Sequence, residues 1–435
     1  MTPIVTRPPL LWALVSTALL AGAWPGLPTR AQTPAAAPQG GASGVLAPAV
    51  EMPSPVADRS QAYALTAGAD GRTYLTWLEP VGGDAHALKF STLNGTVWAP
   101  AREIARGANW FVNWADHPAL TASADGTLFA HWLVHTGRAK GSYGYGVQVA
   151  RSTDGGQTWA RTFTDGIENV ADYAGFVAFV PNATGADAVF LRPEKPDVPG
   201  PAGPGHEGHG GEDEHIKTVA VVSFGGDGRP GPIQTVDADA CTCCMTDIAR
   251  AADGLVAVFR DHQPGEIRDI AVVRQVKGRW TSAVPVARDG WKIPGCPTNG
   301  PAIAARGRQV VVAWFTAAGN TPRLKWATSS DGGATFGSPV VVDAGAPVGY
   351  PDLVLLADGS SVVSWLERKG EGVGDVMVRR VSAAGVASPP VAVARSVSGR
   401  GTGVPHLVRA GTDLLVAWRK DRVQTARVSL AALPR

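Results

Sequence analysis

The sequence has few charged residues. Charged side chains make up 17% of the 435 residues, and 39 basic residues nearly balance 37 acidic ones, which leaves a formal charge of +2. These charges are spread along the whole chain and form no basic stripe, whereas a nucleic-acid-binding surface needs clustered Lys and Arg side chains. We therefore exclude nucleic acid as a partner.

The sequence also has only one long hydrophobic run. Arg7 precedes the stretch LLWALVSTALLAGAW, and the small-residue segment PTRAQ follows it, which is the order of a secretory signal with cleavage after Ala31. No later run approaches the ~20 apolar residues that span a bilayer, and no cysteine follows the run as a lipid anchor. We expect a signal peptide at 1–31, a Pro/Ala/Gly-rich leader at 32–56, and a soluble periplasmic or secreted protein without a transmembrane segment.

Amphipathic helical periodicity is missing after the signal, while Gly (53), Pro (34) and Trp (14) are abundant. Seven segments instead share a short apolar run, a turn such as Asp-Gly, and a longer apolar run that ends near an aromatic residue. These anchor aromatics lie 51 to 69 residues apart and are Trp77, Trp132, Phe190, Phe259, Trp314, Trp365 and Trp418. Each segment is typical of a β-hairpin, and a further strand pair follows it.

Four antiparallel strands at such a period predict the blades of an all-β propeller. The repeat count favours seven blades over residues 57–435, with a six-bladed ring as the alternative. The last repeat lacks its fourth strand, and we expect residues around 45–56 to supply it and close the ring.

Two turns carry a more specific pattern. STDGGQTW (152–159) and SSDGGATF (329–336) match the Asp-box, S-x-D-x-G-x-T-W, and the chain therefore resembles the sialidase-like superfamily of Asp-box (BNR-repeat) propellers. The Asp carboxylate of such a box accepts backbone N–H groups within its own turn, and the glycines permit positive φ. The structural positions are Ser152, Asp154, Gly156, Trp159, Ser329, Asp331, Gly333 and Phe336.

Two features depart from the sialidases of that superfamily. Those sialidases are six-bladed, whereas this chain has seven repeats. Their F-R-I-P signature is also missing, because FLRP (190–193) has a different order and lies in the third repeat. The resemblance therefore implies the fold and leaves the activity open.

The alternation of antiparallel strands places inter-blade loops and the loops between second and third strands on one face, opposite the Asp-boxes. All four cysteines fall on this predicted face, as do eight of the nine histidines. We therefore expect a ligand site here, with His117 and His406 among its residues.

The four cysteines have two interpretations. Cys241, Cys243 and Cys244 precede the fourth repeat, and Cys296 has the equivalent position before the fifth. In an oxidising compartment the default is two disulfides, one of which joins Cys296 to the cluster. The other interpretation is a soft-metal site for copper(I) or zinc. The insertion GHEGHGGEDEH (205–215) offers weak ligands for a divalent metal, or is a solvated loop.

An enzymatic alternative follows from the resemblance, because sialidases use a Tyr nucleophile. Tyr350 has the matching place, with Glu266 as its base and Asp116 as acid/base. Arg260, Arg268 and Arg419 would then hold a substrate carboxylate. We favour a monomeric, non-hydrolytic propeller that binds a metal ion, a small molecule or a glycan at the cysteines, with Arg268, Glu266, Tyr350 and His117 around them. A glycoside hydrolase acting on acidic sugars and a protein-interaction scaffold are the alternatives.

Overall fold

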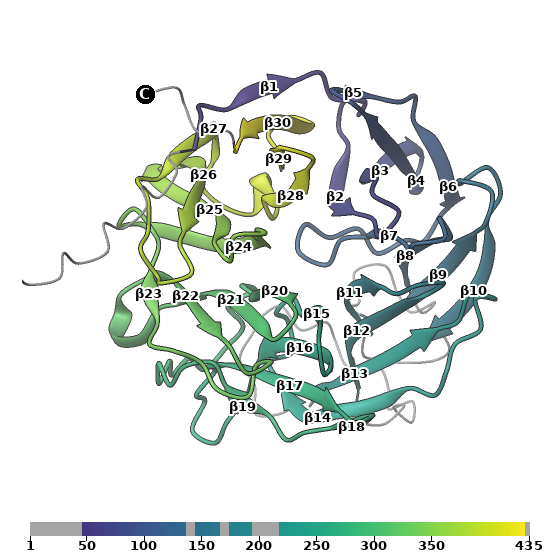
Figure 1. Cartoon of the computed structure of the whole chain (residues 1–435). Helices are drawn as coiled ribbons and strands as arrows, with labels where there is room; N and C mark the ends of the chain where they lie inside the picture. The colour runs from purple at the N-terminus through teal and green to yellow at the C-terminus, as the bar shows by residue number, and fades with distance from the viewer. Residues whose placement is uncertain (1–45, 136–143, 166–173, 194–216, 431–435) are drawn as a thin grey trace, which may run out of the picture. The chain divides into compact units, whose positions relative to one another are not determined.

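The computed structural model describes residues 46–135, 144–165, 174–193 and 217–430. They belong to one compact unit, Ala42–Arg435. In these ranges the chain forms seven antiparallel sheets of four or five strands, and the only helices are two 3₁₀ turns. The sheets follow one another around a ring, which is the predicted seven-bladed propeller (Figure 1). No helix among the described residues is long and apolar enough to cross a membrane.

The blades are numbered in chain order. Blade 1 contains β2 (Gln61–Ala67), β3 (Thr73–Gly82), β4 (Ala85–Asn94), β5 (Val97–Trp98) and β6 (Arg102–Gly107). Blade 2 contains β7 (Leu120–Ala122), β8 (Leu128–His135), β9 (Tyr145–Ser152) and β10 (Ala160–Asp165). Blade 3 contains β11 (Gly175–Pro181), β12 (Ala186–Pro193), β13 (Lys217–Phe224) and β14 (Gln234–Ala240).

Blade 4 contains β15 (Asp247–Ala251), β16 (Gly254–Arg260), β17 (Ile270–Val276), β18 (Arg279–Trp280) and β19 (Val284–Pro285). Blade 5 contains β20 (Ala302–Arg306), β21 (Gln309–Thr316), β22 (Arg323–Ser329) and β23 (Val340–Val341), with the 3₁₀ turn η1 (Ala318–Asn320) between β21 and β22. Blade 6 contains β24 (Pro347–Leu355), β25 (Ser361–Gly370), β26 (Val373–Val381) and β27 (Val391–Val397), and η2 (Arg400–Thr402) follows it.

Blade 7 joins the two ends of the described chain. Its strands are β28 (His406–Ala410), β29 (Asp413–Arg419), β30 (Val423–Ser429) and, from the N-terminal side, β1 (Val50–Met52). β1 pairs antiparallel with β30, with Val50 opposite Arg427 and Met52 opposite Thr425. The fourth strand of the last blade therefore comes from within segment 45–56, and it closes the ring.

The second strand of each blade is buried on both faces because neighbouring blades cover it. The apolar runs in β8 and β21, for example, are buried over most of their length. The seven anchor aromatics of the repeat are all buried, from 0% exposed at Trp77 and Trp365 to 4% at Trp132. The core is a series of apolar layers, each shared between two neighbouring sheets, as the cluster that joins β16 to β21 around Trp314 illustrates.

Side-chain amide and carboxylate oxygens, buried or partly buried, latch neighbouring blades together near the centre. Each accepts a hydrogen bond from a backbone N–H in the first strand of the next blade. The pairs are Asp116 with Phe176, Asp247 with Ile303, Asp352 with Leu407, all at 2.8 Å, and Asn299 with Tyr350 at 2.9 Å. These latches satisfy donors that strand pairing within a blade leaves free.

The turns at 152–159 and 329–336 connect third strands to fourth strands. The Asp154 carboxylate accepts the backbone N–H and the hydroxyl of Thr158, and Asp331 accepts the same two groups of Thr335. These hydrogen bonds lower the pKa of Asp154. Antiparallel alternation places both turns on the face opposite the inter-blade loops.

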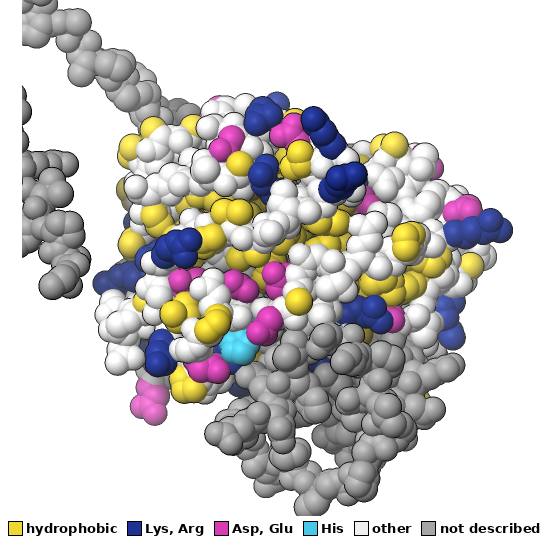
Figure 2. Space-filling model, turned by 90° about the horizontal axis from the view of Figure 1, so that it is seen from below, with side chains coloured by type: hydrophobic (Ala, Val, Ile, Leu, Met, Phe, Trp, Pro, Cys, Tyr) yellow, Lys and Arg dark blue, Asp and Glu magenta, His cyan; other side chains and the backbone are white. Residues whose placement is uncertain are grey.

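On the side of the molecule seen in Figure 2, basic and acidic side chains are interspersed.

Candidate functional site

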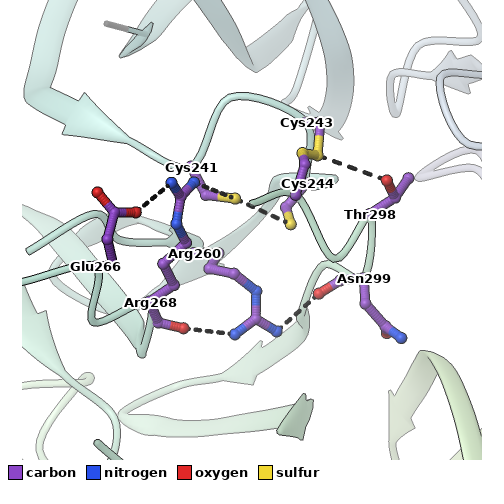
Figure 3. Close-up of a disulfide and its surroundings, with 9 residues drawn as sticks. Cys241, Cys243, Cys244, Arg260, Glu266, Arg268, Thr298 and Asn299 are labelled. Atoms are coloured by element: carbon purple, nitrogen blue, oxygen red, sulfur yellow. Dashed lines mark hydrogen bonds and ion pairs between the residues drawn. A yellow bond between two sulfur atoms is a disulfide. The ribbon is translucent and has the colours of Figure 1, made fainter. Parts of the chain in front are cut away.

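Three loops of one face bring the cysteines together. Cys241, Cys243 and Cys244 lie in the connection from β14 to β15, and Cys296 lies in the connection from β19 to β20. The loop between β16 and β17 adds Glu266 and Arg268. Figure 3 shows the side chains of Cys241, Cys243, Cys244, Glu266 and Arg268 turned toward one another from separate segments of the backbone.

One pair of cysteines is oxidised. Cys243 and Cys296 form a disulfide, with their Cα atoms 6.0 Å apart, and the hydroxyl of Thr298 lies 3.5 Å from the Cys243 sulfur. The bridge ties the entrance of blade 4 to the entrance of blade 5. Of the two predicted disulfides, the one that joins Cys296 to the cluster is therefore present.

The other pair of cysteines is reduced and buried. Cys241 and Cys244 are each 1% exposed, and their sulfur atoms are 3.4 Å apart. The Cys241 sulfur also lies within 4.8 Å of both sulfurs of the disulfide. These two pairs could not be separated from the sequence alone. The C-x-x-C spacing of Cys241 and Cys244 places two thiols within one turn of chain, but it does not fix which of the four sulfurs form the bridge.

Positive charge surrounds the reduced pair. The Arg268 guanidinium is 1% exposed, lies 3.5 Å from the Cys241 sulfur, and pairs with Glu266 at 2.8 Å. The hydrogen bond from Cys244 lowers the pKa of Cys241 and outweighs the effect of burial, and the charges of Arg260 and Arg268 lower it further. Burial raises the pKa of Cys244. The site therefore favours one thiolate at Cys241.

The Arg260 guanidinium is held by contacts within the protein. Its guanidinium donates to the backbone carbonyls of Arg268, Asn299 and Phe315 at 2.7 to 2.8 Å, and it stacks on the ring of Trp291 at 4.8 Å. These contacts join blade 4 to blade 5 and use both terminal nitrogens. Arg260 therefore contributes charge to the cysteine site, while its terminal donors are bound within the protein.

The residues of the hydrolase hypothesis lie in different settings. Tyr350 is 8% exposed and contacts the ring edge of Trp114 at 5.1 Å, and burial raises its pKa. Asp116 is 1% exposed, accepts hydrogen bonds from Tyr145 and Phe176 at 2.8 Å, and has its pKa raised to about 7 by burial. Among the described residues, no hydrogen bond joins Tyr350 to Glu266 or to Asp116.

The remaining predicted ligand residues belong to blades 2 and 7. Arg419 donates to the backbone carbonyls of Ser60 and Gly401. The rings of His117 and His406 meet edge to face at 4.6 Å, and His406 lies 3.6 Å from Asp352. The structure thus brings Glu266 and Arg268 to the cysteines and gathers the histidines elsewhere. The insertion at 205–215 lies outside the described residues.

No family model and no curated protein matches this sequence. Among solved structures, the chain is similar to the polysaccharide lyase Uly1, with 10% identity, 86% of this chain and 91% of that chain covered, and a TM-score of 0.50. A protein of unknown function from Dyadobacter fermentans is 15% identical, with coverages of 89% and 99% and a TM-score of 0.47. A sialidase from Trypanosoma rangeli is 13% identical, with coverages of 76% and 55% and a TM-score of 0.44. The likeness to Uly1 shows the fold alone, in agreement with the propeller that the Asp-box resemblance implied.

Proposed function

We propose that this protein is an exported, non-hydrolytic propeller that binds copper(I) through Cys241 and Cys244. The observation that carries the proposal is a buried pair of reduced thiols, 3.4 Å apart, beside a disulfide and a buried guanidinium. Thiolates are soft ligands, and soft ligands select copper(I) among the common metal ions. Burial of the pair supports the proposal further, because it keeps water and oxidants away from the metal.

The local charge supports copper(I) more than zinc. Two thiolates and one copper(I) ion carry a net charge of −1. Together with the charge of Glu266, it is balanced by the buried guanidinium groups of Arg260 and Arg268. Structural zinc sites use four nitrogen or sulfur ligands. The Cys243–Cys296 disulfide withholds two of the four sulfurs, so zinc would need that bridge to be reduced first.

An exported location fits the same chemistry. The N-terminal segment has the order of a secretory signal, and disulfides persist in oxidising compartments such as the periplasm. We place the mature protein in the periplasm or outside the cell, as a monomer. Within the described part of the chain, Tyr350 makes no hydrogen bond to Glu266 of the kind that a nucleophile and its base need for glycoside hydrolysis.

Competition with a chromophoric copper(I) chelator, carried out without oxygen, tests the proposal. We expect one copper(I) per wild-type chain, with binding lost in Cys241→Ser and in Cys244→Ser. The matched control is the double variant Cys243→Ser and Cys296→Ser, which removes the other two sulfurs and should still bind one copper(I). Equal loss of binding in the control would show that all four sulfurs are ligands, and wild-type protein that takes no copper would refute the proposal.

A further inference from the structure

The buried dithiol and the neighbouring disulfide meet at one sulfur atom. The sulfur of Cys241 lies 3.4 Å from that of Cys244. It also lies within 4.8 Å of both sulfurs of the Cys243–Cys296 bridge, and Cys244 is outside this group of three. A thiolate that attacks a disulfide forms a new bridge and releases one of the two old sulfurs. Cys241 is therefore placed to pass a disulfide bond from one pair of cysteines to the other.

The two pairs differ in their access to solvent. Cys241 and Cys244 are each 1% exposed, whereas Cys243 and Cys296 are partly exposed. A dissolved reagent therefore reaches the sulfurs of the bridge and does not reach the thiols beneath it. Electrons that leave the buried dithiol for a reagent in solution have to pass through the bridge, and the contact at Cys241 provides that route.

The attacking and the departing sulfur each lie beside a group that stabilises negative charge. The Thr298 hydroxyl lies 3.5 Å from the Cys243 sulfur, and it is the donor because a disulfide sulfur has no proton (Figure 3). Thr298 has φ of 47°, in the left-handed region where a β-branched residue is an outlier. Such strain persists only where the surrounding structure imposes it. The buried Arg268 guanidinium lies 3.5 Å from the Cys241 sulfur and favours a thiolate there.

We propose that the four cysteines form a thiol–disulfide relay that transfers two electrons from the buried dithiol to a low-molecular-weight disulfide in solution. Cys241 attacks Cys296, a bond forms between these sulfurs, and the electron pair of the broken bond leaves on Cys243. Cys244 then attacks Cys241, the inner bridge forms, and Cys296 leaves as a thiolate. The inner thiols release their protons to solvent and the outer sulfurs take up the same number, so the chain gains and loses no electrons in these two steps.

The outer pair then reduces the substrate. Cys243 attacks the external disulfide and releases one thiolate. Cys296 attacks Cys243, releases the second thiolate and re-forms the outer bridge. The substrate gains two electrons, and the chain loses two, because Cys241 and Cys244 are now joined. The relay shares these thiols with the proposed copper site but does not depend on copper, since the metal-free protein carries it out.

The reaction of metal-free protein with dithionitrobenzoate, a chromogenic disulfide, tests the relay without oxygen. The absorbance of the released thiolate gives its amount per chain. We expect two equivalents from wild type and one from Cys244→Ser, in which Cys243 is released and captures the probe. Cys241→Ser should release none, because Cys244 does not reach the bridge.

Direct attack by the buried thiols would instead give one equivalent from each single variant. That result overturns the relay, and so does wild-type protein that releases no thiolate. Because no metal is present, a chain that reacts and fails to bind copper(I), or the reverse, separates this proposal from the copper proposal.

The position of the probe in Cys244→Ser gives a second readout. After acid quenching and alkylation, peptide mapping should find thionitrobenzoate on Cys243 and a bridge between Cys241 and Cys296. Thionitrobenzoate on Cys241, with the original bridge intact, overturns the relay whatever the stoichiometry.

Thr298 is a positioning residue whose variant should change the rate and not the amount of thiolate released. Thr298→Val keeps the branched shape, removes the hydroxyl and should slow the release several-fold, as expected for loss of one hydrogen bond. The matched control is Thr321→Val, which removes an exposed hydroxyl between η1 and β22 and should leave the rate unchanged. Equal rates for Thr298→Val and wild type would overturn the role of this hydroxyl.

Discussion

The disulfide offers a prediction that separates its structural role from the proposed metal site. Cys243 and Cys296 are 53 residues apart, and the bridge joins the entrances of two neighbouring blades. Closing a loop of this length removes chain entropy from the unfolded state that corresponds to about 4 kcal/mol of stability. We expect the double variant Cys243→Ser and Cys296→Ser to lose about this much free energy of unfolding.

Guanidinium unfolding, followed by tryptophan fluorescence, measures this loss as a lower midpoint. In a thermal scan, the same loss corresponds to about 5 °C in a domain of this size. Wild-type protein under a strong reductant is the matched control, and it should approach the stability of the double variant. An unchanged midpoint in the double variant, together with loss of copper(I) binding, would refute the reasoning, because the two sulfurs would then be ligands and not a bridge.

Three further predictions concern the surroundings of the site. Arg268→Gln removes the charge 3.5 Å from Cys241 and should raise the pH at which the thiolate forms, measured by ultraviolet absorbance; no change would contradict the charge argument. Burial raises the pKa of Asp116 from 3.8 to about 7. The contribution of this carboxyl group to the free energy of unfolding is therefore fully present below the unfolded-state pKa and is lost as the pH rises through about 7. The free energy of unfolding should therefore fall over that pH window, and Asp116→Asn should reduce the slope; a slope that is unchanged would exclude this cause. Asn299→Ala leaves the buried backbone N–H of Tyr350 and the partly buried carbonyl of Val348 without their partner, and it should cost about 2–4 kcal/mol in guanidinium unfolding. Asn94→Ala, at an exposed position, should cost little, and equal costs would contradict the latch.

Much of the fold could be predicted from the sequence because the repeat is a property of local pattern. Each blade buries its second strand on both faces, so the apolar run and its aromatic anchor recur wherever a blade occurs, as at Trp314 and Trp365. The short last repeat indicated a missing strand, and β1 supplies it. The blade-to-blade latches were not predicted, because a single Asp such as Asp352 has no sequence signature.

The candidate site could be predicted only in outline. Topology placed the cysteines on one face, and the structure brings their sulfurs together. Which cysteine pairs with which depends on the side-chain directions of two loops, and sequence spacing does not fix these. The role of Arg260 was also beyond sequence reasoning, since its three carbonyl partners come from segments of blades 4 and 5 that are distant along the chain.

The most direct test of the central claim is the intact mass of protein exported from cells grown with copper and zinc, measured under native conditions and again after denaturation with alkylation of free thiols. The account predicts one bound copper in the native mass, then one disulfide and two alkylated thiols in the denatured mass. A metal-free protein with two disulfides would contradict it, as would zinc bound to a chain with four alkylated thiols.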